Sequence, residues 1–214
     1  MFLDILGEPR SRLLRKVLAD PPVPNAYLAG GTALALILGH RESVDFDWFS
    51  PAMFDAEAVA ESLSQLGQLH ISETKKGTFH GFVNGIQVTW LYYPNPLLED
   101  FITSPEIPGL YLASLVDIAV MKWSALSSRG SRKDFIDLYF IAQAGLEIQS
   151  LVPLLAKKFP DSNINYYHMI KSLSYFDDAE HEAWPVMHKS VQWEEVKAFF
   201  RQQQKLLLDK CLCK

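Results

Sequence analysis

The sequence NAYLAGGTALALILGHRESVDFDWF, residues 25–49, contains three predicted elements in close succession. Its first five residues predict a short strand. A glycine pair, Gly30 and Gly31, is followed by an uninterrupted apolar run over residues 32–38, which is typical of a buried helix that begins near the glycines. Residues 44–49 alternate acidic and apolar side chains, which is the period of a half-buried strand.

Two carboxylates lie on the second predicted strand. Asp45 and Asp47 are two residues apart, so both side chains are expected to project from the same face. Two unpaired carboxylates at that separation repel each other, and a divalent cation relieves the repulsion. Mg²⁺ prefers hard oxygen ligands and usually completes its shell with substrate phosphate oxygens. We interpret the pair as metal ligands; the alternative is a solvated strand face.

The glycine pair marks a predicted phosphate site. Glycines at a strand-to-helix junction let backbone N–H groups and the helix N-terminus approach a phosphate closely, and Thr32 can add a hydroxyl donor. The alternative is a tight turn without a ligand. A strand, a Gly-Gly helix start and a second strand with Asp-x-Asp form the arrangement that opens a polymerase-β-like nucleotidyltransferase.

Beyond this stretch, the patterns predict a sheet region and then a helical region. Asn84-Gly85, flanked by two strand-like runs, is a strong signal for a β-hairpin. Prolines at positions 94 and 96 end the sheet region. The expected strands are residues 68–74, 78–83 and 86–93, and the expected helices are residues 2–18, 55–66, 115–128, 132–144 and 193–208.

These elements predict an α+β fold, a polymerase-β-like nucleotidyltransferase mixed sheet with flanking helices and a C-terminal helical extension. Residues 1–112 are expected to form the α/β core with its N-terminal helix. Residues 113–214 are expected to form a helical region packed on that core.

Composition narrows the function classes. A net charge of -5 argues against broad, nonspecific nucleic-acid binding, which needs a basic face. The most apolar stretch, residues 26–39, falls short of the roughly 20 residues that cross a bilayer, so no membrane association is expected. Cys211 and Cys213 leave no loop for a disulfide to close, and a reducing cytoplasm is the expected location.

Two motifs resemble those of the AbiEii/AbiGii toxin family. GGT at residues 30–32 with HRESVDFDWF at residues 40–49 is similar to the first motif of that family. KWSALSSRGSRKDFIDL at residues 122–138 is similar to its later lysine and aspartate motif, and YYPNPLL at residues 92–98 resembles one branch of the family. The motifs occur in the expected order over roughly residues 25–145.

The resemblance implies a nucleotidyltransferase fold, Mg²⁺-dependent use of a nucleoside triphosphate (NTP) and a toxin role in a toxin-antitoxin or phage-defence pair. Related toxins modify tRNA acceptor ends, so an RNA such as tRNA, or a protein hydroxyl, is the implied acceptor, and a cognate antitoxin is the implied partner. The implied catalytic residues are Asp45, Asp47, Lys122 and Asp137, with Asp45 and Asp47 as metal ligands. The implied nucleotide-binding residues are Gly30, Gly31, Thr32, Ser43, Arg129 and Lys133.

Several of these residues also have a structural interpretation. Lys122 and Arg129 are alternatively solvated helix cations, and Lys133 is spaced to pair with Asp137 four residues later. For His40 the structural role is favoured, as a helix cap or a bond to a backbone carbonyl. Ser43 is alternatively a donor that orients one of the aspartates.

One position departs from the pattern of the fold. Nucleotidyltransferases of this fold commonly carry a third carboxylate on a later strand, where it joins the metal and can act as a base. The strand IQVTWLY at residues 86–92 has no acid, and Thr89 occupies the expected position; Asp100 and Asp137 are candidate substitutes. The sequence therefore leaves three hypotheses: an active nucleotidyltransferase toxin, a weakened nucleotide- or partner-binding member, and a structural protein that keeps only the fold.

Overall fold

The computed structural model describes the backbone of residues 1–212 and the side chains of residues 1–209. Cys213 and the side chain of Cys211 lie outside this description. The chain folds into two compact units. The first contains residues 1–96 and 100–114, and the second contains residues 97–99 and the chain from Leu115 onward.

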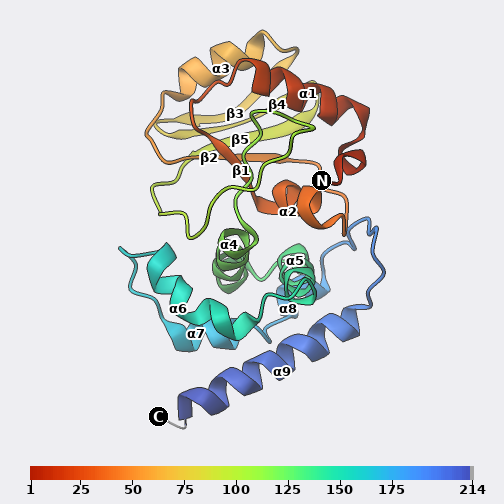
Figure 1. Ribbon diagram of the computed structural model, residues 1–214, viewed down its shortest axis with the longest axis vertical. Coiled ribbons are helices and arrows are strands. Elements are labelled where there is room, and N and C mark those ends of the chain that lie inside the picture. Colours follow the sequence, from red (N-terminus) through yellow and green to blue (C-terminus); the bar gives the residue numbers. More distant parts are fainter. Residues whose placement is uncertain (213–214) are drawn as a thin grey trace. The chain divides into compact units, whose positions relative to one another are not determined.

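A five-stranded mixed sheet forms the centre of the first unit (Figure 1). The strand order is β1-β2-β5-β4-β3, in which β2 and β5 are parallel and the other neighbours are antiparallel. The tight connection at Asn84-Gly85 joins β4 to β5, as the hairpin signal predicts. The strands are β1 (Tyr27–Ala29), β2 (Phe46–Ser50), β3 (Leu69–Lys75), β4 (Thr78–Val83) and β5 (Ile86–Tyr92).

Helices cover both faces of this sheet. Figure 1 shows α1 and α3 on one side of the sheet and α2 on the other. Side chains alternate across a strand, so Trp48, Phe79 and Trp90 are buried on one face while their neighbours point to the other. The helical elements of this unit are η1 (Leu3–Leu6), α1 (Gly7–Ala19), α2 (Gly30–Leu38) and α3 (Ala56–Ser64).

Within the described part of the chain, six helices build the second unit. Trp123 is fully buried and donates its indole N–H to the Met169 carbonyl at 2.9 Å. The Phe135 ring contacts the rings of Phe176, Trp193 and Phe200, which come from later parts of the chain. The helices are α4 (Leu115–Arg129), α5 (Arg132–Gln143), α6 (Ile148–Lys158), α7 (Tyr166–Ser172), α8 (Asp177–Glu180) and α9 (Trp193–Leu212).

The structure confirms the predicted mixed α/β fold and shifts one boundary that matters for the site. Helix α2 begins at Gly30, so the glycine pair starts the helix as predicted. Strand β2 begins at Phe46, so Asp45 precedes the strand instead of lying on it. The Thr32 side chain donates a hydrogen bond to the Asp45 carbonyl, which is therefore held by the helix.

The edges of the sheet carry features that the sequence patterns did not indicate. Next to β1, Leu28 exchanges backbone hydrogen bonds of 2.9 Å with Tyr111 and Ala113. At the opposite edge, the pairing of β3 with β4 changes register between Ile71 and Glu73. Tyr111 and Ala113 lie outside the predicted strands, whereas the register change lies inside the predicted strand 68–74, where an alternating pattern does not reveal an extra residue.

Among the described residues, no single helix is long and apolar enough to cross a membrane. Helices α5 and α6 meet the length and composition criteria only when taken together across a 114° bend.

A buried ion pair organises the second unit. Lys158 Nζ lies 2.6 Å from Asp117 Oδ1, and both side chains are fully buried. The Asp117 carboxylate also accepts the backbone N–H groups of Leu98 and Glu99. This carboxylate therefore fastens the segment 97–99 to helices α4 and α6.

We expect Lys158→Met to lower the free energy of unfolding by about 3–5 kcal/mol, because the substitution leaves a buried carboxylate without its cation. Lys157→Met is the matched control, since Lys157 is exposed on the same helix and its loss should cost less than about 0.5 kcal/mol. Equilibrium urea unfolding of the two variants measures the difference. Equal losses in both variants would contradict a structural role for the buried pair.

Candidate nucleotide and metal site

The Asp47 carboxylate lies against the first residue of helix α2. The antiparallel pairing of β1 and β2 places Ala29 opposite Asp47, and Gly30 follows with a φ of +68°. A Cβ atom on Gly30 would lie 2.7 Å from Asp47 Oδ2. Glycine at this position therefore provides both the left-handed backbone and the space for the carboxylate.

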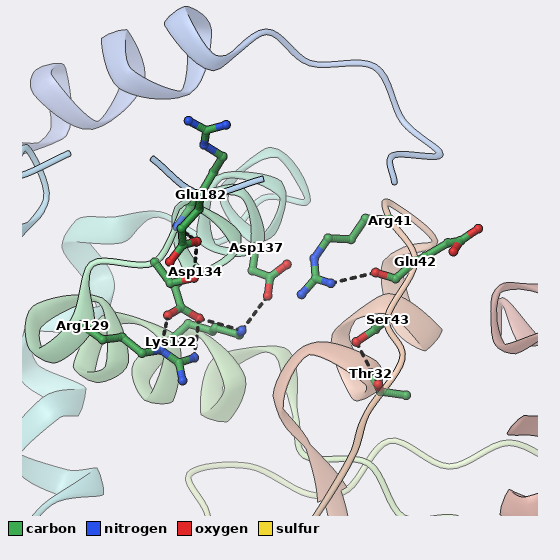
Figure 2. A network of polar contacts seen from close by, with 11 residues as sticks. Thr32, Arg41, Glu42, Ser43, Lys122, Arg129, Asp134, Asp137 and Glu182 are labelled. Carbon is green, nitrogen blue, oxygen red and sulfur yellow. Dashed lines mark hydrogen bonds and ion pairs between the residues drawn. The ribbon is translucent and has the colours of Figure 1, made fainter. Parts of the chain in front are cut away.

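Thr32 and Ser43 hold the segment that carries Asp45. Their hydroxyl oxygens are 2.9 Å apart and share a hydrogen bond, which Figure 2 shows. Thr32 also binds the Asp45 carbonyl, and its side chain is almost fully buried. A Thr32 hydroxyl donor for phosphate stays a prediction, while its observed contacts position Asp45 beside the start of α2.

Arg41 is a cation at this site that the sequence interpretation missed. A Cβ atom on Gly31 would lie 2.7 Å from Arg41 Nη2 and 3.1 Å from Ser43 Oγ. Arg41 Nη1 donates to the Glu42 carbonyl at 2.8 Å, and the residue is 3% exposed. The guanidinium therefore lies close to the N-terminal turn of α2. The available signal in the sequence was the position of Arg41 within the motif HRESVDFDWF.

Thr89 is the strand neighbour of Asp47. The parallel pairing of β2 and β5 puts the two residues in register, and Thr89 is 3% exposed. The Thr89 hydroxyl is bonded to His80 Nδ1 at 3.1 Å. The position where an acid is expected thus holds a threonine that is hydrogen-bonded to an imidazole. Sequence reasoning did not single out this histidine, His80.

In the second unit, Lys122, Asp134 and Asp137 form a buried cluster, which the largely exposed Arg129 joins. Lys122 Nζ lies 2.9 Å from Asp134 Oδ1 and 2.6 Å from Asp137 Oδ2. Arg129 Nε lies 2.8 Å from Asp134 Oδ2, which Figure 2 also shows. Burial by itself would raise the pKa of Asp134, but the charges and hydrogen bonds of Lys122 and Arg129 outweigh it and lower that pKa.

The remaining predicted residues lie around these two groups. Lys133 is exposed on α5, and Asp137 pairs with Lys122. Asp100 is exposed in the first unit, and His40 is fully buried directly after the αL residue that ends α2. The predicted residues thus fall into two groups, one at the start of α2 and one on α4 and α5.

Comparison with known proteins assigns the chain to a family. The family described as Nucleotidyl transferase AbiEii toxin, Type IV TA system, matches residues 12–89 and 89–210. The chain belongs to the AbiEii nucleotidyltransferase toxin family. This AbiEii-family chain is also 35% identical to an uncharacterized protein of Aquifex aeolicus (strain VF5) over 207 residues, which covers 95% of the chain and 98% of the relative.

Solved structures share the fold of this AbiEii-family protein. MenT4, a nucleotidyltransferase toxin from Mycobacterium tuberculosis H37Rv, superimposes with a TM-score of 0.60 at 18% identity, covering 92% of this chain and 81% of MenT4. A protein of H. pylori named as a nucleotidyltransferase gives a TM-score of 0.55 at 17% identity, covering 93% of this chain and 91% of that one. At these identities the similarity shows the fold alone.

The AbiEii-family site fits a magnesium ion that arrives with a substrate. Within residues 1–212, no three His, Cys, Asp or Glu side chains are grouped so that they could hold a metal by themselves. Mg²⁺ is usually bound by one or two carboxylates together with substrate phosphates, and the Asp47 carboxylate beside Gly30 fits one such ligand, while Asp45 as a second ligand stays a prediction. The Asp47 carboxylate at the glycine start of α2 gives such phosphates a place beside it.

We expect Gly30→Ala to destabilise the protein more than Gly85→Ala, by at least about 1 kcal/mol. Both glycines have positive φ, +68° and +78°, so both alanines bear the left-handed penalty. Only the Gly30 substitution adds a Cβ against a carboxylate, because nothing lies within 4 Å of a Cβ at Gly85. Urea unfolding of both variants measures the difference, and equal destabilisation would contradict the contact with Asp47.

The lowered pKa of Asp134 predicts acid sensitivity of the second unit. A carboxyl group whose pKa is lower in the folded state stabilises the fold above its unfolded pKa, and this contribution is lost as the pH falls through the folded value. Asp134→Asn should therefore be less stable than the wild type at pH 7, with a gap that shrinks below about pH 4. Urea unfolding across pH 3–7 tests this, and a constant gap would contradict it.

Proposed function

We propose that this AbiEii-family protein is a Mg²⁺-dependent enzyme that transfers a nucleotide from an NTP to a hydroxyl group of an RNA, with tRNA as the first candidate acceptor. The observation that carries the proposal is the Asp47 carboxylate against Gly30 at the N-terminus of α2. A carboxylate for the cation and a helix start for the phosphates are thereby brought to one point.

The first unit supplies the nucleotide and metal ligands in this proposal. Asp45 and Asp47 hold Mg²⁺, which supplies charge neutralisation to the triphosphate. The backbone at Gly30 and Gly31 binds phosphate oxygens, and Thr32 and Ser43 fix the Asp45 segment. The guanidinium of Arg41 near Gly31 adds a positive charge at the same helix end.

The predicted residues of the second unit have roles that their own contacts define. In the sequence-based assignment, Lys122 neutralises phosphate charge. Its contacts with Asp134 and Asp137 add a second role, in which the ammonium holds two carboxylates in fixed positions. The Arg129 side chain is 64% exposed and Lys133 is also exposed, so both can reach a phosphate from solvent.

The biological role follows from the family. We propose that the protein acts in the cytoplasm as the toxin of a type IV toxin-antitoxin pair, with a cognate antitoxin and a role in phage defence. Because the net charge is -5, recognition of an RNA acceptor would depend on local cationic side chains and not on a basic surface as a whole.

A second candidate function rests on Thr89. The hydroxyl in register with Asp47 stands where an acid is expected, so a protein that binds a nucleotide without transferring it is the alternative. Such a protein would act through its nucleotide-bound complex.

Incubation of the purified full chain with each of the four α-labelled NTPs, Mg²⁺ and total tRNA tests both functions. The proposal expects label on the RNA, lost on chelation by EDTA and reduced at least about 100-fold by Asp47→Ala. Asp20→Ala is the matched control, because Asp20 is an exposed aspartate of the same unit and its loss should leave transfer unchanged.

One outcome would contradict enzymatic transfer, and another would contradict the role of Asp47. Thermal stabilisation by an NTP with Mg²⁺ and without any labelled product supports the nucleotide-binding alternative. Transfer that persists in Asp47→Ala would remove the metal role of that carboxylate.

A further inference from the structure

Four polar residues form a row across four neighbouring strands of the first unit. Asp47 on β2 is in register with Thr89 on β5, and Thr89 is in register with His80 on β4. His80 is in turn paired with Glu73 on β3. Residues directly opposite each other on adjacent strands project from the same face, so the row extends from the proposed metal site to the sheet edge.

The last three members of the row are in contact through their side chains. His80 Nδ1 lies 3.1 Å from Thr89 Oγ1, and His80 Nε2 lies 3.8 Å from Glu73 Oε2. One ring nitrogen thus faces a hydroxyl and the other faces a carboxylate. The His80 side chain is 36% exposed and that of Glu73 is 45% exposed, so solvent and a substrate can reach the imidazole.

We propose that Glu73, His80 and Thr89 form a proton-accepting array that deprotonates the acceptor hydroxyl. This inference rests on the proposed nucleotide transfer and deepens it, because it assigns the base that the strand bearing Thr89 lacks. Thr89 and His80 act on the transferred proton, and Glu73 is a positioning residue.

The transfer step balances with these groups. The acceptor O–H bond breaks as its oxygen forms a bond to the α-phosphorus, and the bond from that phosphorus to pyrophosphate breaks. The acceptor proton passes to Thr89 Oγ1, whose own proton moves to His80 Nδ1. The products are the nucleotidylated acceptor, pyrophosphate and an imidazolium, which later releases its proton to solvent.

Each member has a property that the others lack. Near pH 7 a threonine hydroxyl is too weak a base to keep an additional proton, whereas an imidazole can keep one. A carboxylate near the second ring nitrogen stabilises the imidazolium by its charge, a role that the acid also has in acid-histidine-hydroxyl triads on unrelated folds. Lys75 Nζ lies 2.7 Å from Glu73 Oε1, and its hydrogen bond and charge lower the pKa of Glu73.

The described charged groups beside the His80 imidazole come from the neighbouring strands of the sheet. Strand β3 contributes Glu73 and Lys75, and β5 contributes the uncharged Thr89, beyond which Asp47 lies on β2. A purely structural interpretation of the row is a set of cross-strand pairs worth about 0.2–1 kcal/mol each. Such pairs would affect stability but neither the rate nor its dependence on pH.

Steady-state transfer by His80→Gln is the first test. We expect kcat to fall about 10²–10⁴-fold, with the KM for the NTP within about threefold of wild type. The dependence of the wild-type rate on pH should differ from that of His80→Gln, because only the wild type has an imidazole in this row. His70→Gln is the matched control, because His70 is an exposed histidine of the same sheet, on β3, that packs against Phe82.

Variants of the flanking residues test the array itself. Thr89→Ser keeps the hydroxyl and should keep transfer within about threefold, whereas Thr89→Val should reduce kcat to the level of His80→Gln. Glu73→Gln should reduce kcat about 10-fold and leave the KM unchanged. Equal activity of Thr89→Ser and Thr89→Val would overturn the relay through the hydroxyl.

A measurement without turnover adds an independent criterion. Long-range ¹H–¹⁵N spectra of the uniformly labelled full chain should show neutral His80 with its proton on Nε2, because the proposed array requires Nδ1 to accept the hydrogen bond in its 3.1 Å contact with Thr89. Thr89→Val should change the Nδ1 shift. A proton on Nδ1 in the wild type would overturn the array.

The outcomes separate this inference from the function on which it rests. If Asp47→Ala loses transfer while His80→Gln keeps the wild-type rate and pH profile, the array is wrong and the proposed function stands. If the wild type transfers no label with any NTP, both are wrong.

Discussion

The close approach of the Asp47 carboxylate to Gly30 is the constraint on which the first unit depends. The antiparallel pairing of β1 with β2 brings the end of one strand beside the middle of the other, and helix α2 must begin at that point. A side chain at residue 30 would collide with the carboxylate, so the absence of a Cβ makes the connection and the acidic site compatible. The same contact brings negative charge to the positive end of a helix dipole.

The two units stabilise their carboxylates differently. In the second unit, Asp117, Asp134 and Asp137 are buried, and each is paired with a lysine or an arginine, which offsets the cost of removing charge from water. In the first unit, Asp45 and Asp47 are half-buried, and the Asp47 carboxylate lies beside Gly30 at the start of α2. A helix start offers a carboxylate the positive end of the helix dipole in addition to any charged side chain.

The sequence predicted those parts of the fold and site that depend on local pattern. The apolar period gave helix α2 and the central strands, and the Asn84-Gly85 signal gave the hairpin. Contacts between distant residues could not be predicted in this way. The approach of Arg41 to Gly31 depends on the path of a loop, and the coupling of His80 to Thr89 depends on strand register. The start of β2 was placed too early because the Asp45 carbonyl is bound by a side chain of the helix.

The register change in edge strand β3 decides which residue faces the imidazole of His80. Up to Ile71 the pairing with β4 follows a simple antiparallel count, by which Ser72 would be the next partner and would meet His80. One extra residue moves Glu73 into that place instead. Deletion of Glu73 would restore the simple count and place the Ser72 hydroxyl opposite His80, whereas deletion of Ser72 would leave the carboxylate there. Insertions and deletions at the sheet margin can thus alter proton chemistry without any substitution in the nucleotide site.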